Sequence, residues 1–175
     1  MRITRLLLLF SLISAAHAQT KWTDAKTHVV SISSVASKTG FSADQMRLLQ
    51  KLDSNLDDLR IEKIDLGSQT GYAVQSFGSE WCGAVGNCTF WILDAHMKAI
   101  LSYRAQTFAV LPTSTNGQHD IVLRLHASAT ESMWGLYHFT GTYYRRIQCA
   151  DVNYSPDPEV ILKKPVVSSL PCSRM

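Results

Sequence analysis

The chain has 175 residues, of which 46% are hydrophobic and 18% are charged, so it is long enough to bury a core of its own. Of its 17 basic residues, Arg2 and Arg5 lie beside an apolar run near the N-terminus, which leaves 15 basic against 14 acidic residues. This near balance argues against a nucleic-acid or membrane-surface partner, because both require a clustered excess of Lys and Arg.

Residues 1–18 have the pattern of a secretory signal peptide. Two arginines precede an apolar run over residues 6–13, and small residues at Ala16 and Ala18 form a cleavage motif. We expect cleavage between Ala18 and Gln19 and a periplasmic or secreted product. No other apolar run approaches the roughly 20 residues that a membrane span needs, so no membrane span is expected.

Residues 19–40 are rich in Thr, Ser, Lys and Ala and lack a sustained apolar period. They are expected to form a loosely ordered leader or to add one strand through Val29, Val30 and Ile32. A single β-rich domain is expected to follow over residues 41–149.

A helix is predicted to begin after Ser42. This residue is of the N-cap type, Gln45 completes a capping box three residues later, and Phe41 is placed to pack on Met46. Apolar residues then recur at helical spacing, which predicts one amphipathic helix from residue 43 to the region of residues 52–56.

After Leu59 the sequence shows short apolar or alternating runs separated by turn residues, which is typical of an antiparallel meander. We expect a mainly β (α+β) fold with one N-terminal helix and one meander sheet of about six to seven strands. The runs span residues 59–66, 71–77, 89–93, 99–111, 120–127, 133–139 and 143–149.

The dipeptide Asn116-Gly117 predicts a type I′ hairpin turn, because both residues accept positive φ angles. A two-residue turn makes one face of the hairpin apolar, as a core-facing hairpin requires. The expected pairs are Pro112 with Ile121, Val110 with Leu123 and Phe108 with Leu125.

Thr140-Gly141 marks a second hairpin, in which two-residue and three-residue loops give different strand pairs, so its register stays open. Beyond Cys149 lie four of the chain's five prolines. Residues 150–175 are therefore expected to form an irregular tail with no inner strand.

The four cysteines are each expected to be half of a disulfide, because the product matures in an oxidising compartment. Of three possible connectivities we favour Cys82 with Cys88, which staples a short loop, and Cys149 with Cys172, which ties the tail to the last strand. On the loop-entropy model the two rings contribute about 2.4 and about 3.5 kcal/mol. Ligand pairs such as C-x-x-C are absent, so no metal or other cofactor is expected.

The polar face of the strand after Asn116-Gly117 gathers residue types that occur in catalytic sites. A backbone rise of about 6.6 Å separates His126 from Ser128, so a direct hydrogen bond would need a bulge, and no G-x-S-x-G elbow occurs. We interpret the face as solvated, with ordinary ion pairs and no catalytic residue. A small hydrolase using His126 with Ser128, Asp120 or Glu131 is the alternative.

Most aromatic residues are expected in the core. A stapled loop flanked by Trp81, with Arg145 and Arg146 adjacent in the last hairpin, would nevertheless suit a rigid binding surface, because little ordering entropy is lost on docking. The candidate binding residues are Trp81, Asp120, Arg124, His126, Tyr143 and Arg145.

Residues 81–149 resemble a set of small exported bacterial β-domain proteins. The resemblance brings no assigned activity with it. It follows the order Cys82-x5-Cys88, Thr89-Phe-Trp-Ile92, Asn116-Gly117-x-x-Asp120-Ile-Val122, His126-x-Ser128-Ala129, Phe139-x-Gly141-x-Tyr143 and Cys149.

The sequence thus predicts an exported, disulfide-stapled binding or inhibitory module of the cell envelope, in which no catalytic chemistry is identified. Its partner would be a protein or an envelope polymer. The alternatives are the small hydrolase and a purely structural envelope protein.

Overall fold

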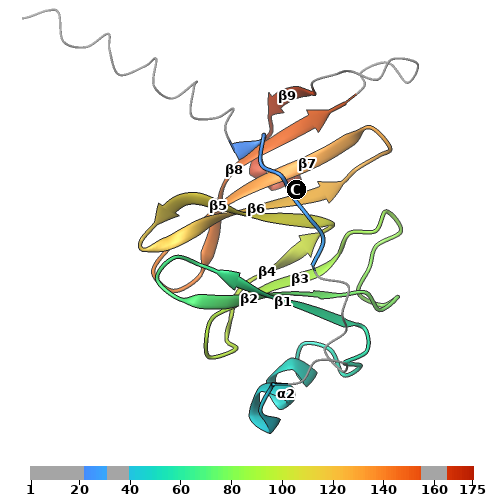
Figure 1. Cartoon of the computed structure of the whole chain (residues 1–175). Coiled ribbons are helices and arrows are strands. Elements are labelled where there is room, and N and C mark those ends of the chain that lie inside the picture. The colour runs from blue at the N-terminus through green and yellow to red at the C-terminus, as the bar shows by residue number, and fades with distance from the viewer. Residues whose placement is uncertain (1–21, 31–39, 155–164) are drawn as a thin grey trace, which may run out of the picture.

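The computed structural model describes residues 22–30, 40–154 and 165–175 (Figure 1). The predicted signal peptide and its cleavage site lie outside these residues. Within them the chain is mainly β, with two antiparallel sheets, the helix α2 (Ala43–Gln50) and the short 3-10 helix η1 (Cys172–Arg174). No helix in these ranges is long and apolar enough to cross a membrane.

Both sheets follow the order of the sequence. The first contains β1 (Leu59–Asp65), β2 (Thr70–Ser76), β3 (Cys88–Leu93) and β4 (Ala99–Ala105). The second contains β5 (Thr107–Thr115), β6 (Gln118–His126), β7 (Glu131–Phe139), β8 (Tyr144–Asn153) and β9 (Val166–Ser169).

The expectation of one meander sheet is wrong, because the apolar run over residues 99–111 is two strands that meet at Gln106. Ala105 still pairs with Cys88 of β3, whereas the N–H of Gln106 donates to the carbonyl of Arg124 in β6 at 2.8 Å. The chain thus passes from one sheet to the other within one residue. No Gly or Pro marks this corner in the sequence.

The two sheets share a hydrophobic core, to which each contributes one face. Phe90 and Ile92 of β3 pack in this core with Phe108 of β5 and with Ile121 and Leu123 of β6. All five side chains are at most 1% exposed. Each sheet is therefore anchored on the other by large apolar side chains.

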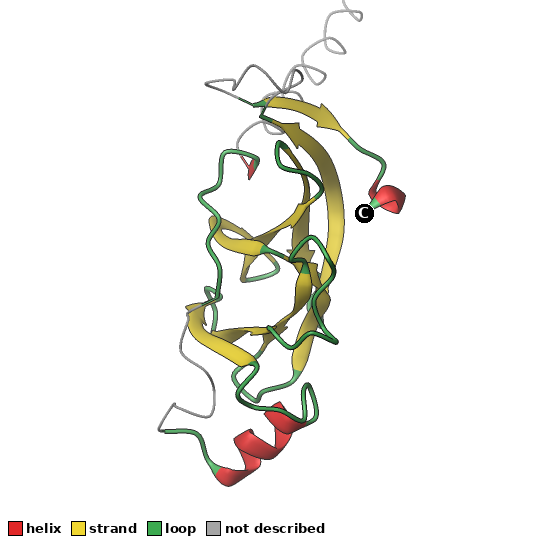
Figure 2. Ribbon diagram, turned by 90° about the vertical axis from the view of Figure 1, so that its right-hand side faces the viewer, coloured by secondary structure: helices red, strands yellow, loops and turns green. Residues whose placement is uncertain are grey.

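The outer faces of the sheets are also covered. Leu49 of α2 packs with Leu59 and Trp91 of the first sheet, and α2 lies at the end of the molecule opposite β9 (Figures 1 and 2). On the second sheet, Trp22 packs with Val122 and Trp134.

The capping box is confirmed, but the helix is shorter than predicted. The N–H of Gln45 donates to Ser42 Oγ at 3.2 Å, and Gln45 Oε1 accepts from the N–H of Ser42 at 2.9 Å. The helix ends at Gln50 and does not reach residues 52–56. Shortly beyond it the N–H of Asn55 donates to Asp53 Oδ1, a local turn that competes with helical pairing.

The described part of the leader, residues 22–30, is packed and not loosely held. Val30 is 1% exposed and belongs to the core between the sheets. His28 and Phe108 exchange two backbone hydrogen bonds of 2.9 Å, so the segment adds one β-bridge to the edge of β5. Ile32 lies outside the described residues.

The Asn116-Gly117 turn has the predicted positive φ angles, and Thr115 pairs with Gln118 as a two-residue turn requires. A bulge between Val110 and Ser114 then shifts the register by two, so the three predicted pairs are wrong. The apolar face survives, because an even shift keeps each side chain on its side of the sheet. Phe108 pairs with Leu123, and Val110 pairs with Ile121.

The second hairpin has a four-residue loop. Phe139 pairs with Tyr144, and the hydroxyl of Thr140 donates to the carbonyl of Tyr143 at 2.8 Å.

The tail is more regular than expected. β8 continues past Cys149, and β9 pairs with its last four residues, Ala150 to Asn153. Ala150 to Asn153 therefore pair with β7 on one side and β9 on the other, so the expectation that the tail holds no inner strand is wrong. The two favoured disulfides, Cys82–Cys88 and Cys149–Cys172, are both present.

Candidate binding groove

A groove of about 430 Å³ lies between β4 and the start of β8. Consecutive side chains of a strand alternate between its two faces, so a hollow that touches consecutive residues lies along the strand's edge. Both strands therefore present an edge to the groove. Its lining residues are Ala99, Ile100, Leu101, Ser102 and Tyr103 of β4, Tyr137 of β7, Tyr143 of the hairpin loop, and Tyr144, Arg145 and Arg146 of β8.

The backbone edges beside the groove have no neighbouring strand. β4 is the last strand of its sheet and pairs only with β3. β9 reaches no further along β8 than Ala150, so residues 144–148 pair with β7 alone. Among the described residues, no further backbone hydrogen bond involves residues 99–103 or residues 144–148. The groove thus separates two unpaired strand edges.

The charged residues that line the groove are two arginines, and none of the described residues that line it is acidic. Arg145 is exposed, whereas Arg146 is half-buried and stacks on the ring of Tyr103, with its Cζ 4.8 Å from the ring centroid. Arg146 Nη1 donates to the hydroxyl of Tyr103. Of the two arginines that line the groove, Arg145 has its charged group exposed to solvent, and Arg146 is fixed by stacking and hydrogen bonding.

Two tyrosines of the groove are buried. Burial raises the pKa of Tyr137, although the charge of Arg146 and a side-chain interaction with it partly oppose this effect. Burial also raises the pKa of Tyr144, and the carboxylate of Asp120 adds to the effect. The Tyr144 hydroxyl donates to the carbonyl of His119 at 2.8 Å. Tyr143, in contrast, is 53% exposed and offers its ring to solvent.

The C-terminal segment lies at one end of the groove and accepts hydrogen bonds from two side chains of the groove. Arg146 Nη2 donates to the carbonyl of Cys172 at 2.8 Å, and the hydroxyl of Tyr103 donates to the main-chain oxygen of the last residue, Met175, at 2.7 Å. The Cys149–Cys172 disulfide keeps this segment on β8. Backbone carbonyls are thus acceptors that fit the groove's donors.

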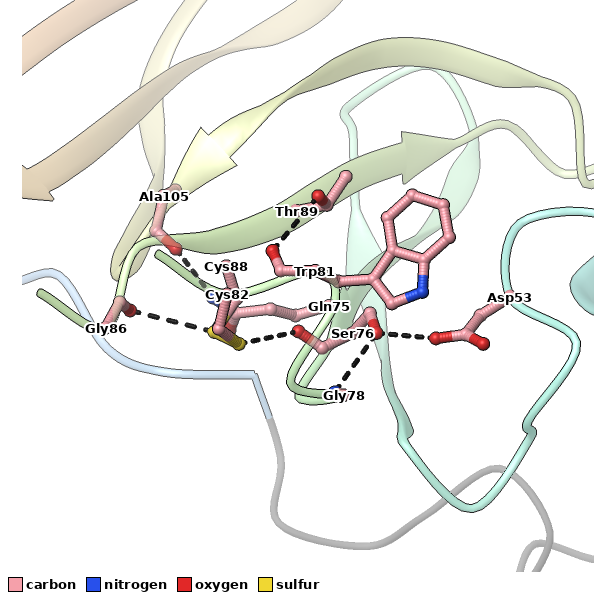
Figure 3. The surroundings of a disulfide bond; sticks show 10 residues. All are labelled: Asp53, Gln75, Ser76, Gly78, Trp81, Cys82, Gly86, Cys88, Thr89 and Ala105. Carbon is pink, nitrogen blue, oxygen red and sulfur yellow. Dashed lines mark hydrogen bonds between the residues drawn. A yellow bond between two sulfur atoms is a disulfide. The ribbon is translucent and has the colours of Figure 1, made fainter. Parts of the chain in front are cut away.

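Of the candidate binding residues, Tyr143 and Arg145 meet in the groove and the other four do not. Trp81 directly precedes the stapled loop, and its ring lies 6.1 Å from that of Trp91 (Figure 3 shows Trp81 next to Cys82 of the disulfide). The expected combination of the stapled loop with Arg145 on one surface is therefore not seen in the lining of the groove.

The polar strand face is not the solvated face that we expected. Asp120 is 4% exposed and accepts a hydrogen bond from the hydroxyl of Thr115, and His138 Nε2 lies 3.7 Å from its Oδ2. Arg124 lies between two rings, 5.9 Å from the centroid of Trp134 and 5.8 Å from that of Tyr154. On this face Asp120 is buried, and Arg124 and His126 are half-buried.

His126 has a structural role through its backbone. Asn87, in the stapled loop, donates from Nδ2 to the His126 carbonyl and accepts from the His126 N–H at Oδ1, both at 2.8 Å. One amide side chain thus continues the ladder of β6 and ties the stapled loop of the first sheet to the second sheet.

The structure does not assemble the side chains of the hydrolase alternative. Ser128 Oγ hydrogen-bonds Glu131 in the turn between β6 and β7, and no hydrogen bond joins the imidazole of His126 to Ser128, Asp120 or Glu131. No group of three or more His, Cys, Asp or Glu side chains in the described ranges could hold a metal ion.

Sequence reasoning placed Arg146 beside Arg145 in the last hairpin but did not include it among the candidate binding residues. It missed Tyr103 as a groove residue and Asn87 as a link between the sheets. No signal pointed to Tyr103 or Asn87, because each acts on a strand that is distant in the sequence.

Comparisons of the chain with protein-family models, with curated proteins and with solved structures found no match. The function is therefore argued from the groove.

Proposed function

We propose that this chain is an exported, non-catalytic binding module of the cell envelope that holds an anionic partner in the groove between β4 and β8. The observation that carries the proposal is the groove's composition, in which two arginines and exposed aromatic surface meet without an acidic side chain. Arg and Tyr are the residue types on which binding energy is most often concentrated.

The geometry favours binding by a surface that is already formed. Arg146 is fixed by Tyr103 and by the carbonyl of Cys172, so little of its side-chain entropy remains to be lost. A hydrogen bond between an arginine and a carboxylate contributes roughly 1.5–3 kcal/mol. Two such contacts with Arg145 and Arg146, together with a stacking group on Tyr143, are the proposed basis of affinity.

The test is binding of poly-L-glutamate to the exported protein, measured by isothermal titration calorimetry at low salt. We expect Arg145→Ala to weaken binding about tenfold, which corresponds to about 1.4 kcal/mol. The matched control is Lys51→Ala, which removes the same charge from the exposed residue that follows α2 and is expected to change binding little. Equal binding by the two variants, or no binding by the parent protein, would overturn the proposal.

Export is the part of the proposal that rests on residues 1–18. N-terminal sequencing of the purified protein is expected to start at Gln19. A product that retains Met1 to Ala18 would contradict this part.

A further inference from the structure

We infer that the free edge of β9 (Val166–Ser169) is a self-association site, at which a second copy of this chain pairs its own β9 in the antiparallel direction. The second sheets of the two copies then join into one continuous sheet across a two-fold axis. This inference is independent of the proposed function, because no residue of β9 lines the groove between β4 and β8.

Three of the four sheet edges in the described chain are protected against further strand pairing. β1 carries four charged residues among its seven, and β5 contains Pro112 and a bulge and is bridged by His28. At β4, a hydrogen bond between Tyr103 and Arg146 crosses the gap to β8, so no further strand fits there. Charges, prolines, bulges and covering segments are the means by which proteins prevent edge-to-edge pairing.

β9, the outermost strand of the second sheet (Figure 1), has none of these features. Its sequence Val-Val-Ser-Ser contains no charged residue and no proline, and its pairing with β8 has no bulge. All four residues are exposed, Val166 by 54% and Val167 by 39%. Among the described residues, no segment bonds the outer edge of β9. An uncharged and uncovered edge of this kind recruits another strand.

The pairing with β8 shows which backbone groups of β9 point outward. The N–H of Leu170 donates to the carbonyl of Cys149 at 3.0 Å, so the backbone groups of Leu170 face β8. In an antiparallel ladder, the backbone groups of successive residues face opposite edges in turn. The N–H and C=O groups of Val167 and Ser169 therefore point away from β8 and are available to a second strand.

Two prolines set the register of the proposed pair. Pro165 and Pro171 bound a stretch of five residues whose centre is Ser168. With the two-fold axis at Ser168, Val167 of each copy lies opposite Ser169 of the other copy. Every outward N–H group of the two strands then has a carbonyl acceptor, because these opposite residues exchange both of their hydrogen bonds.

Symmetry and charge favour a second copy as the occupant of this edge. In the proposed register Val166 lies opposite Leu170 of the other copy, and the two-fold axis repeats this apolar contact. The nearest charged residues in the sequence are Lys164 and Arg174, so no like charges face each other within the paired stretch. Five residues bury much less than a standard interface of about 1,600 Å², so we expect a weak dimer that depends on concentration.

Sedimentation equilibrium of the exported protein, from about 10 μM to about 1 mM, measures this association. We expect an equilibrium between monomer and dimer that Val167→Lys weakens about tenfold, because the substitution places a charge on both paired edges. The matched control is Val85→Lys in the stapled loop. Val85 is 47% exposed and lies outside β9, so this variant is expected to associate like the parent protein.

Cysteine variants test the register. Opposite residues that exchange no hydrogen bonds have Cα atoms about 4.5 Å apart, which is within the range of a disulfide. After oxidation, Ser168→Cys is therefore expected to form a covalent dimer on a non-reducing gel. Val167→Cys is the control, because its two copies are offset along the strands by two residues and lie too far apart to be bridged.

Several outcomes would overturn the inference. A protein that stays monomeric at about 1 mM does not pair with itself, and β9 is then open to a strand of another protein. A dimer that Val85→Lys weakens as much as Val167→Lys uses another surface. Equal cross-linking by Val167→Cys and Ser168→Cys contradicts the proposed register. None of these results concerns Arg145, so the binding of poly-L-glutamate tests the proposed function separately.

Discussion

The chain covers the sheet edges on one side of the molecule and leaves those on the other side partly open. On the side of β1 and β5, residues 22–30 form a β-bridge with Phe108 of β5 through His28 and insert Val30 into the core. On the side of β4 and β8, the described chain supplies only the C-terminal segment, which bonds Tyr103 and Arg146 at one end of a groove of about 430 Å³. The first side is completed by apolar packing, and the second keeps polar and aromatic side chains available.

A β-sandwich can thus have one covered pair of edges that stabilises the fold and one open pair that is free to bind a partner. A sheet edge that is covered by its own chain has its backbone groups satisfied and does not recruit other strands. The edges of β4 and β8 beside the arginines are left open, and this is the side on which we propose that a partner binds. Each of the following predictions changes one side and compares it with a matched site.

The largest effect is expected from the disulfide at the groove. Replacing Cys149 and Cys172 by Ser should lower the free energy of unfolding by up to about 3.5 kcal/mol, because the unfolded chain regains a long loop. The matched double variant at Cys82 and Cys88 should lose less, up to about 2.4 kcal/mol. Urea unfolding of both variants measures the difference. A larger loss at the short staple would show that the C-terminal segment contributes little to this side.

A smaller effect is expected on the side of β5. Val30→Ala removes buried methyl groups from the core and should cost about 2 kcal/mol. The neighbouring Val29 is 48% exposed, so Val29→Ala should change the free energy of unfolding by less than about 0.5 kcal/mol. Equal effects in urea unfolding would mean that residues 22–30 do not complete the fold.

Two buried hydroxyls sharpen the comparison on the groove side. Tyr144→Phe removes the hydrogen bond to the His119 carbonyl and should cost about 1 kcal/mol. Tyr137→Phe removes a hydroxyl whose polar neighbour, Arg146, is already bonded to Tyr103 and Cys172, so the loss of stability should be smaller. Thermal unfolding of both variants tests this order, and a greater loss from Tyr137→Phe would reverse it.

The same tyrosines predict alkaline sensitivity. Because burial raises the pKa of Tyr137 and Tyr144, the folded state retains protons that the unfolded state releases above about pH 10. This contribution to stability is complete below the unfolded pKa and falls as the pH rises toward the folded pKa. The double Phe variant should therefore lose less stability than the parent between pH 9 and pH 12 in urea unfolding. An unchanged pH dependence would contradict the burial of these phenols.

Local features of the fold were predictable from the sequence, and long-range ones were not. The capping box at Ser42 and the turn at Asn116-Gly117 depend on neighbouring residues, so their patterns were sufficient. The corner at Gln106 depends on which strands the two halves of the run pair with. No local pattern determines that choice, and the single-sheet expectation was therefore wrong.

In the candidate site, too, the local features were predictable and the long-range contacts were not. Tyr143 and Arg145 were identified because they stand together in one hairpin. Tyr103 lies 43 residues from Arg146 in the sequence, and their contact exists because β4 and β8 end on the same side of the sandwich. Asp120 was assigned to a solvated face, since the sequence does not show that neighbouring side chains bury it.

Hydrogen exchange of the backbone amides tests the central claim most directly, because it reports on both sides of the sandwich in one sample. With poly-L-glutamate bound, we predict slower exchange in residues 99–103 and residues 144–148 and unchanged exchange in β1 and β5. Unchanged exchange along β4 and β8 at saturating poly-L-glutamate, or slowing confined to the stapled loop near Trp81, would contradict the account.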